Sequence, residues 1–139
     1  MNEERKSKSY HIINLTLAGI ILMIFLYSGL FSAEKDNHPI PSFYERITGE
    51  QTNSSGMSRA FSEIIRGNFD EARAYNKNSI LVFLFFLVQF FQRIGISFVV
   101  KKGWQKQFRI IVYDISTSIV LFLFCFWGLI RSMVQILAS

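Results

Sequence analysis

The sequence IINLTLAGIILMIFLYSGLF, residues 12–31, decides the fold. These 20 residues carry no charge, and as an α-helix rising about 1.5 Å per residue they would cross a hydrocarbon core roughly 30 Å thick. A cleaved signal peptide is the alternative, but the apolar run is too long for one, and cleavage after Ala33 would put Phe31 where a small residue is needed. The stretch therefore predicts a transmembrane helix over residues 11–32.

Two more apolar runs predict transmembrane helices over residues 78–100 and 110–137. The chain of 139 residues is 50% hydrophobic and contains 15 phenylalanines, which is more than an ordinary soluble core of this size holds. We therefore expect an all-α membrane protein with three transmembrane helices and an amphipathic helical loop between the first and the second.

The basic residues indicate how these helices are oriented. The formal net charge is +5, and the basic side chains gather at the ends of the apolar runs instead of alternating with aromatic residues on a soluble face, which argues against nucleic-acid binding. Residues 1–10 are expected to form a flexible basic head and residues 101–109 a basic turn on the same side of the membrane. By the positive-inside rule that side is cytoplasmic, so residues 33–77 would face outward. The residues behind this argument are Arg5, Lys6, Lys8, Lys101, Lys102, Lys106 and Arg109.

Two short helices are expected within residues 33–77. Met57, Phe61, Ile64 and Ile65 recur at helical spacing, which predicts an amphipathic helix over residues 58–66 that stops at Gly67. A second helix should follow, with Asn68 as its N-cap and Glu71 completing a capping box. Isolated helices this short are marginal in water, so both should lie against the membrane surface or the ends of the spans.

Polar residues inside the second and third spans need partners, because a buried charge costs about 2.5 to 3.5 kcal/mol on insertion scales. In an antiparallel hairpin turning near Gly103, Arg93 and Asp114 lie at similar depth, and the same reflection pairs Gln89 with Ser118. The two residues on each span are four apart and share a face. We predict an ion pair or water-bridged contact between Arg93 and Asp114. This seam is either an ion or proton pathway or, as we favour, an internal contact that holds the hairpin together.

The segment TGEQTNSSGMSRA, residues 48–60, carries the most specific motif. It resembles the signature of a bacterial membrane family catalogued as domain of unknown function 2752, in which the loop reads Thr-Gly-x-x-Cys-Pro-x-Cys-Gly-x-Thr-Arg-Ala. The similarity extends over about 45 residues into the second span. The matching residues are Thr48, Gly49, Gly56, Ser58 (in place of threonine), Arg59, Ala60, Gly67, Asn68, Phe69, Ala72 and Asn76.

The chain departs from the family pattern where chemistry would be expected. The two family cysteines fall at Thr52 and Ser55, the proline between them at Asn53 and a later proline at Lys77. A neutral hydroxyl lacks the nucleophilicity and the metal affinity of a thiolate. The resemblance therefore implies a membrane architecture and no cysteine chemistry.

The remaining loop residues could still bind an anion such as a lipid headgroup. Glycines permit a tight turn, Ser55 or Ser58 could cap the helix that follows, and Arg59 would add donors beside its N-terminus. The structural alternative, which we favour, is that Arg59 pairs with Glu63 one turn later or with carbonyl groups of the loop, and that the glycines only fold the loop. The candidate binding residues are Thr48, Gly49, Gly56, Ser58, Arg59 and Asn76.

No residues with a catalytic, metal-binding or cofactor-binding pattern are evident. Cys125 is the single cysteine, and His11 and His38 are isolated from other ligand types. The loop serines have no identifiable base. We therefore expect a non-enzymatic interaction or scaffold subunit in contact with the lipid bilayer and with a membrane-protein partner or further copies of itself. The alternatives are a lipid-headgroup-binding protein or membrane-embedded enzyme using the loop, and an oligomeric pore or permeation subunit using the seam.

Overall fold

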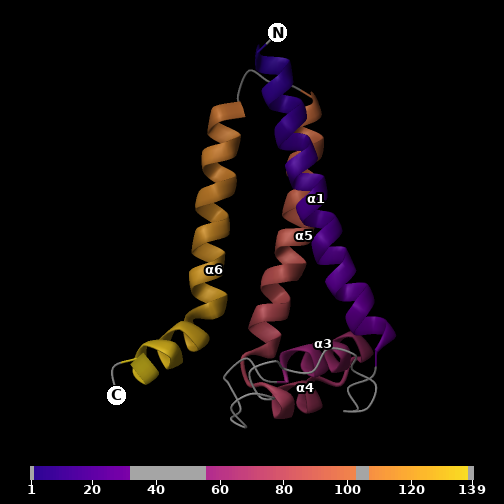
Figure 1. Ribbon diagram of the computed structural model, residues 1–139, viewed down its shortest axis with the longest axis vertical. Coiled ribbons are helices and arrows are strands. Elements are labelled where there is room, and N and C mark those ends of the chain that lie inside the picture. The colour runs from indigo at the N-terminus through magenta and orange to yellow at the C-terminus, as the bar shows by residue number, and fades with distance from the viewer. Residues whose placement is uncertain (1, 32–55, 103–106, 138–139) are drawn as a thin grey trace. The chain divides into compact units, whose positions relative to one another are not determined.

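The computed structural model describes residues 2–31, 56–102 and 107–137, and within these ranges all of the regular structure is helical. The first helix is α1, Asn2–Leu30. Two short helices, α3 at Met57–Arg66 and α4 at Phe69–Tyr75, precede the long helices α5, Ser79–Lys102, and α6, Gln107–Leu137 (Figure 1). The predicted all-α fold is confirmed.

Three of these helices contain segments long and apolar enough to cross a membrane: Ser7–Leu30, Ser79–Val100 and Phe108–Arg131. Each holds more residues than the roughly 20 that a bilayer core requires. They correspond to the three spans predicted from the apolar runs. The chain is thus an all-α, multi-pass membrane protein.

The expected flexible head is wrong, because α1 begins at Asn2 and continues without interruption into the first span. Residues 2–10 contain no glycine or proline that would end a helix. The Ser7 hydroxyl donates to the backbone oxygen of Val100 at 3.2 Å, so the start of α1 also contacts α5. The first ten residues therefore belong mainly to α1.

The chain divides into two compact units, described here separately. The first unit comprises residues 1–23 and 85–124 and contains parts of α1, α5 and α6. Its buried apolar residues include Ala18 and Ile21 on α1 and Val100 on α5. Four polar residues of this unit are buried as well: Asn14, Gln89, Ser97 and Asp114.

The second unit comprises residues 24–84 and 125–139. In Figure 1, α3 and α4 lie across the start of α5. Phe83 of α5 packs against both α1 and α3. Its ring centroid lies 5.0 Å from that of Phe25 on α1 and 5.2 Å from that of Phe61 on α3. Ile64 and Ala72 are also buried, so α3 and α4 are packed against the ends of the spans in this unit as expected.

Both short helices were predicted, and Gly67 and Asn68 stand at the expected cap positions, but the N-cap of α3 and the capping box of α4 differ from the prediction. Gly56 is the N-cap of α3, and its φ of 77° favours glycine; neither Ser55 nor Ser58 takes this position. The α3 helix ends at Gly67 in a Schellman motif, with the Asn68 backbone N–H donating to the Glu63 carbonyl. The Asn68 side chain makes no capping hydrogen bond to α4 and donates instead to the Glu63 carboxylate at 2.6 Å. The capping box is therefore wrong, because Asn68 is engaged by α3.

Candidate functional site

The first unit contains an ion pair between two transmembrane helices. Arg93 Nη1 on α5 lies 2.6 Å from Asp114 Oδ2 on α6, and the side chains are 12% and 1% exposed. The predicted contact between these residues is confirmed. The opposite charges compensate one another in a region where a lone charge would be costly.

Arg93 also donates to three neutral side chains, one on each helix of the unit. Its Nη1 contacts the Asn14 side-chain oxygen on α1 at 3.0 Å, and its Nη2 contacts the Ser118 hydroxyl on α6 at 2.7 Å. Gln89, one turn earlier on α5, accepts from Arg93 Nε at 3.2 Å and from Nη2 at 2.9 Å. The planar guanidinium can make all of these bonds because its five donors point in fixed, divergent directions.

Asp114 is the common acceptor on the other side of the ion pair. The Tyr10 hydroxyl of α1 donates to Asp114 Oδ2, and Gln92 Nε2 of α5 donates to Oδ1 at 2.7 Å. Gln92 Nε2 also lies 3.0 Å from the Thr117 hydroxyl and 3.3 Å from that of Ser118. Every helix of the first unit thus contributes to the carboxylate or to the guanidinium. We call this set the polar cluster: Tyr10, Asn14, Gln89, Gln92, Arg93, Asp114, Thr117 and Ser118.

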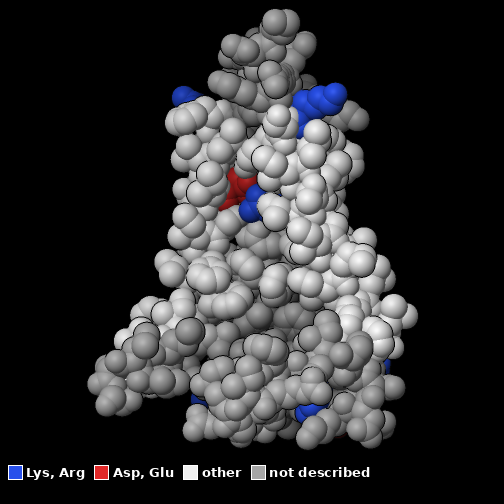
Figure 2. Space-filling model, viewed as in Figure 1, with Lys and Arg blue, Asp and Glu red and all other residues white. Residues whose placement is uncertain are grey.

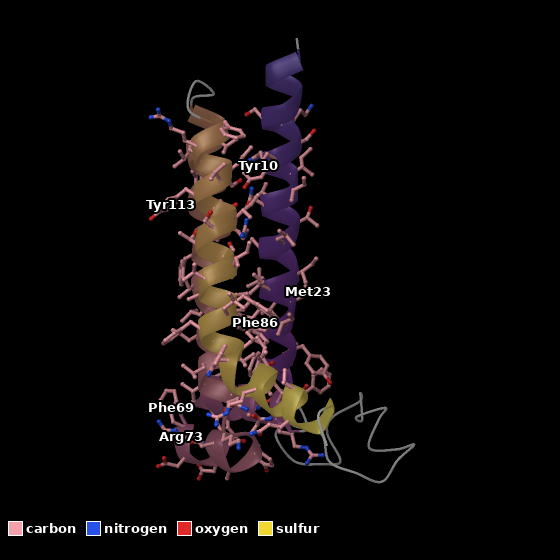
Figure 3. The ribbon with its side chains drawn as sticks, turned by 90° about the vertical axis from the view of Figure 1, so that its left-hand side faces the viewer. Tyr10, Met23, Phe69, Arg73, Phe86 and Tyr113 are labelled. Atoms are coloured by element: carbon pink, nitrogen blue, oxygen red, sulfur yellow. The ribbon has the colours of Figure 1, made fainter. Side chains whose placement is uncertain are left out.

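The polar cluster is directed into the helix bundle of the first unit. Figure 3 shows Tyr10 in the space beside α1, whereas Tyr113, next to Asp114 in the sequence, points away from the bundle and is 72% exposed. In Figure 2, one acidic and one basic group adjoin one another, and uncharged side chains surround them. Asn14 is fully buried. Of the cluster's buried polar atoms, Gln89 Nε2 has no hydrogen-bond partner in the structure.

Sequence reasoning found part of this cluster. Gln89 and Ser118 were expected to face each other, but the structure places both against Arg93, which lies between them. Tyr10, Asn14, Gln92 and Thr117 were missed. One signal for the α1 residues was available in the sequence. Tyr10, Asn14 and Ala18 follow one another at intervals of four residues and therefore lie on one face of α1, which is the buried face at Asn14 and Ala18.

His11, for which the sequence offered no metal-ligand partner, contacts α5 through Ser97. Its Nδ1 lies 2.5 Å from the Ser97 hydroxyl of α5 and 3.3 Å from the Ser97 backbone oxygen. Ser97 is 2% exposed. A histidine beside a hydroxyl could serve as a general base, but a substrate cannot reach this hydroxyl because Ser97 is buried. We therefore interpret the contact as one that holds α1 against α5.

The loop candidates are only partly described. Thr48 and Gly49 lie outside the described residues, as do Thr52, Asn53 and Ser55. Gly56 approaches the end of α4 closely, since a Cβ at this position would meet the Tyr75 carbonyl oxygen at 2.6 Å. Ser58 is exposed on the first turn of α3, and Arg59 is half-buried beside it. The structure thus brings Gly56 close to Tyr75, the residue before Asn76, so these two members of the predicted motif lie near one another.

Asn76 has a structural role at the junction of α4 and α5. Its backbone N–H donates to Ala72, its side-chain oxygen accepts from the Asn78 N–H at 2.9 Å, and its carbonyl accepts from Ser79. The expected pair of Arg59 with Glu63 is wrong, since the ion pairs within the described ranges are Arg73–Asp70 and Arg93–Asp114. Glu63 is engaged by Asn68 instead.

No group of three or more His, Cys, Asp or Glu residues that could hold a metal ion occurs among the residues that the structure describes. Cys125 is a free thiol with 1% exposure. Comparisons with protein-family models, curated proteins and solved structures found no match to this chain.

Proposed function

We propose that this chain is a non-enzymatic interaction or scaffold subunit of a bacterial inner membrane, with its N-terminus in the cytoplasm. The observation that carries the proposal is the set of bonds made by Arg93, which joins side chains from α1, α5 and α6 in one place. An ion pair of this kind fixes which helix faces meet, which is the property that a scaffold needs. Apart from Gln89 Nε2, the buried side-chain nitrogen and oxygen atoms of the polar cluster have hydrogen-bond partners, whereas a substrate site would leave more of them unbonded.

The remaining surface of the spans supports the same interpretation. Large apolar side chains cover the outer faces of the three helices, including Met23 at 67%, Phe98 at 64% and Phe124 at 69% exposure. Such surfaces suit lipid or the apolar span of a neighbouring protein. An internally bonded polar core combined with an apolar exterior favours a partner-binding role over ion permeation.

The proposed orientation depends on the basic residues at the cytoplasmic ends of the spans. Fusion of a reporter that folds only in the cytoplasm to the N-terminus, and of one active only outside it to the C-terminus, should give signal from both. Signal from the reverse pair of fusions would overturn the orientation.

We also propose that the chain is a divergent member of the family of domain of unknown function 2752. Support comes from two of the matched glycines, Gly56 and Gly67, which are the positive-φ glycines of the described ranges. Both are needed by the backbone of the α3–α4 motif. The resemblance therefore concerns residues that shape the loop, and it adds no activity.

The partner can be sought by affinity purification from native membranes in mild detergent, followed by native mass spectrometry. We expect a second membrane protein, or further copies of this chain, at fixed stoichiometry. Asp114→Asn should weaken this complex because it disturbs the helix arrangement, whereas Ile20→Leu, at a lipid-facing position, should retain it. Chemical crosslinking in native membranes provides a second measurement. A chain that is monomeric in detergent and forms no crosslinked product in membranes would overturn the proposal.

A further inference from the structure

Bulky apolar side chains of both α3 and α4 remain uncovered in the second unit. Ile65 is 42% exposed and Phe69 is 51% exposed, although the neighbouring Phe61 and Ile64 are buried. Single exposed apolar residues are common on protein surfaces. Here, however, Ile65 lies against the end of a span, because its Cγ2 is 3.8 Å from the position of a Cβ on Gly29.

The spans of the same unit also have exposed apolar side chains. Leu26 and Leu30, on the last turns of α1, are 52% and 79% exposed, and Leu81, near the start of α5, is 40% exposed. These leucines belong to segments that cross the bilayer. Ile65 therefore lies beside the last turn of α1, where the candidate membrane span Ser7–Leu30 ends.

Arg73 at the end of α4 and Lys77 after it supply basic side chains, whereas the first turn of α4 holds Asp70 and Glu71. Phe69 and Arg73 are four residues apart and project from the same side of α4 (Figure 3). The Arg73 side chain is 62% exposed, and its contact with Asp70 is long, at 3.4 Å. Exposed pairs of this kind contribute little, so a lipid phosphate can replace the carboxylate. Lys77 is likewise exposed, two residues before α5 begins.

We propose that α3 and α4 anchor the second unit in the interface of the membrane. Ile65 and Phe69 enter the boundary between headgroups and acyl chains, and Arg73 and Lys77 bind the phosphates of anionic lipids. Apolar and aromatic side chains flanked by arginine and lysine are the composition of helices that lie in this layer. Ala74, on a different face of α4, stays in water. This inference is independent of the proposed protein partner.

Tryptophan fluorescence tests the depth of Phe69 in the full-length protein. In a background with Trp104→Phe and Trp127→Phe, the variant Phe69→Trp is reconstituted into vesicles of phosphatidylglycerol and phosphatidylcholine. The matched control is Ala74→Trp in the same background, an exposed position on the same helix. We expect lipids brominated near the headgroup end of the acyl chain to quench the Phe69→Trp variant strongly. Aqueous acrylamide should quench the Ala74→Trp control several times more than the Phe69→Trp variant.

Equal quenching of both variants by acrylamide would overturn the proposal. Ile65→Trp provides the same comparison if Phe69→Trp does not retain the helicity of the parent. The charge component is tested by the ratio of phosphatidylglycerol to phosphatidylcholine that copurifies from mixed vesicles. Arg73→Gln with Lys77→Gln should lower this ratio by about fivefold for each charge removed, whereas the exchange Arg73→Lys with Lys77→Arg should preserve it. An unchanged ratio in the glutamine variant would exclude phosphate binding by these residues.

Discussion

Arg93 Nη1 and Asp114 Oδ2 lie 2.6 Å apart between α5 and α6, and α1 contributes a bond to each of them. Asn14 accepts from the guanidinium, and the Tyr10 hydroxyl donates to the carboxylate. The ion pair is thus a contact among three helices. A change in either residue should affect the whole first unit and not the hairpin alone.

Asp114→Asn should destabilise the protein strongly. The asparagine has nearly the same shape, but it leaves the buried guanidinium of Arg93 without a counter-charge. Breaking a buried ion pair from one side costs about 3 to 5 kcal/mol. The measurement is the free energy of unfolding in mixed micelles of mild detergent and denaturing detergent.

The matched comparison is the double variant Arg93→Gln with Asp114→Asn. It removes both charges, so part of the lost stability should return relative to Asp114→Asn alone. If the single variant proved as stable as the parent protein, the ion pair would not be holding the helices together.

Asn14→Leu should have a smaller effect of the same sign. It removes the acceptor for Arg93 Nη1 but leaves the ion pair intact, and it also removes the bond from Asn14 Nδ2 to the Tyr10 carbonyl at 2.9 Å. Hydrogen bonds between transmembrane helices contribute about 0.6 to 2 kcal/mol each. Ile13→Leu serves as the control, since Ile13 is 52% exposed and should tolerate the change. A loss as large as that of Asp114→Asn would contradict this ranking.

The spans and the ion pair could be predicted because each depends on a single property of the sequence. For the spans this is the length of the uncharged run, and for the ion pair it is the distance of each residue from the turn. Uncharged length alone identifies a membrane helix, and a short turn makes the α5–α6 hairpin antiparallel, so depth follows from residue number. The face of α1 that meets this hairpin is not determined in the same way. A long connection separates α1 from α5, so Tyr10 and Asn14 could be assigned to the polar cluster only from the structure.

The short helices show the same division between local and tertiary information. Periodic apolar residues and Gly67 defined α3 closely, because helix formation and termination are local. The capping side-chain contacts were missed because each depends on a choice between competing partners. The Asn68 side chain bonds to Glu63 in α3 and not to an N–H of α4, and the close approach of Gly56 to Tyr75 exists only after α3 and α4 have packed.

Cys125 should resist thiol reagents until the protein opens. It is the single cysteine of the chain, it is 1% exposed, and it lies within a span where water and thiolate are both scarce. A small maleimide should label native protein very slowly and denatured protein completely, as measured by intact mass. Ser58→Cys, at an exposed position of α3, should add one rapidly labelled site. Rapid labelling of Cys125 in the native protein would show that its surroundings open frequently.

Gly56→Ala should destabilise the α3–α4 segment more than Gly67→Ala does. Both glycines have positive φ, 77° and 85°, which costs an L-residue about 1 to 2 kcal/mol. At Gly67 a Cβ meets nothing within 4 Å, so this conformational cost is the whole effect. At Gly56 the new Cβ would also lie 2.6 Å from the Tyr75 carbonyl oxygen, a backbone atom that can move only if α4 shifts. Hydrogen–deuterium exchange of the α3 and α4 amides should therefore accelerate more in Gly56→Ala, and equal acceleration in the two variants would mean that the contact with Tyr75 does not hold the helices together.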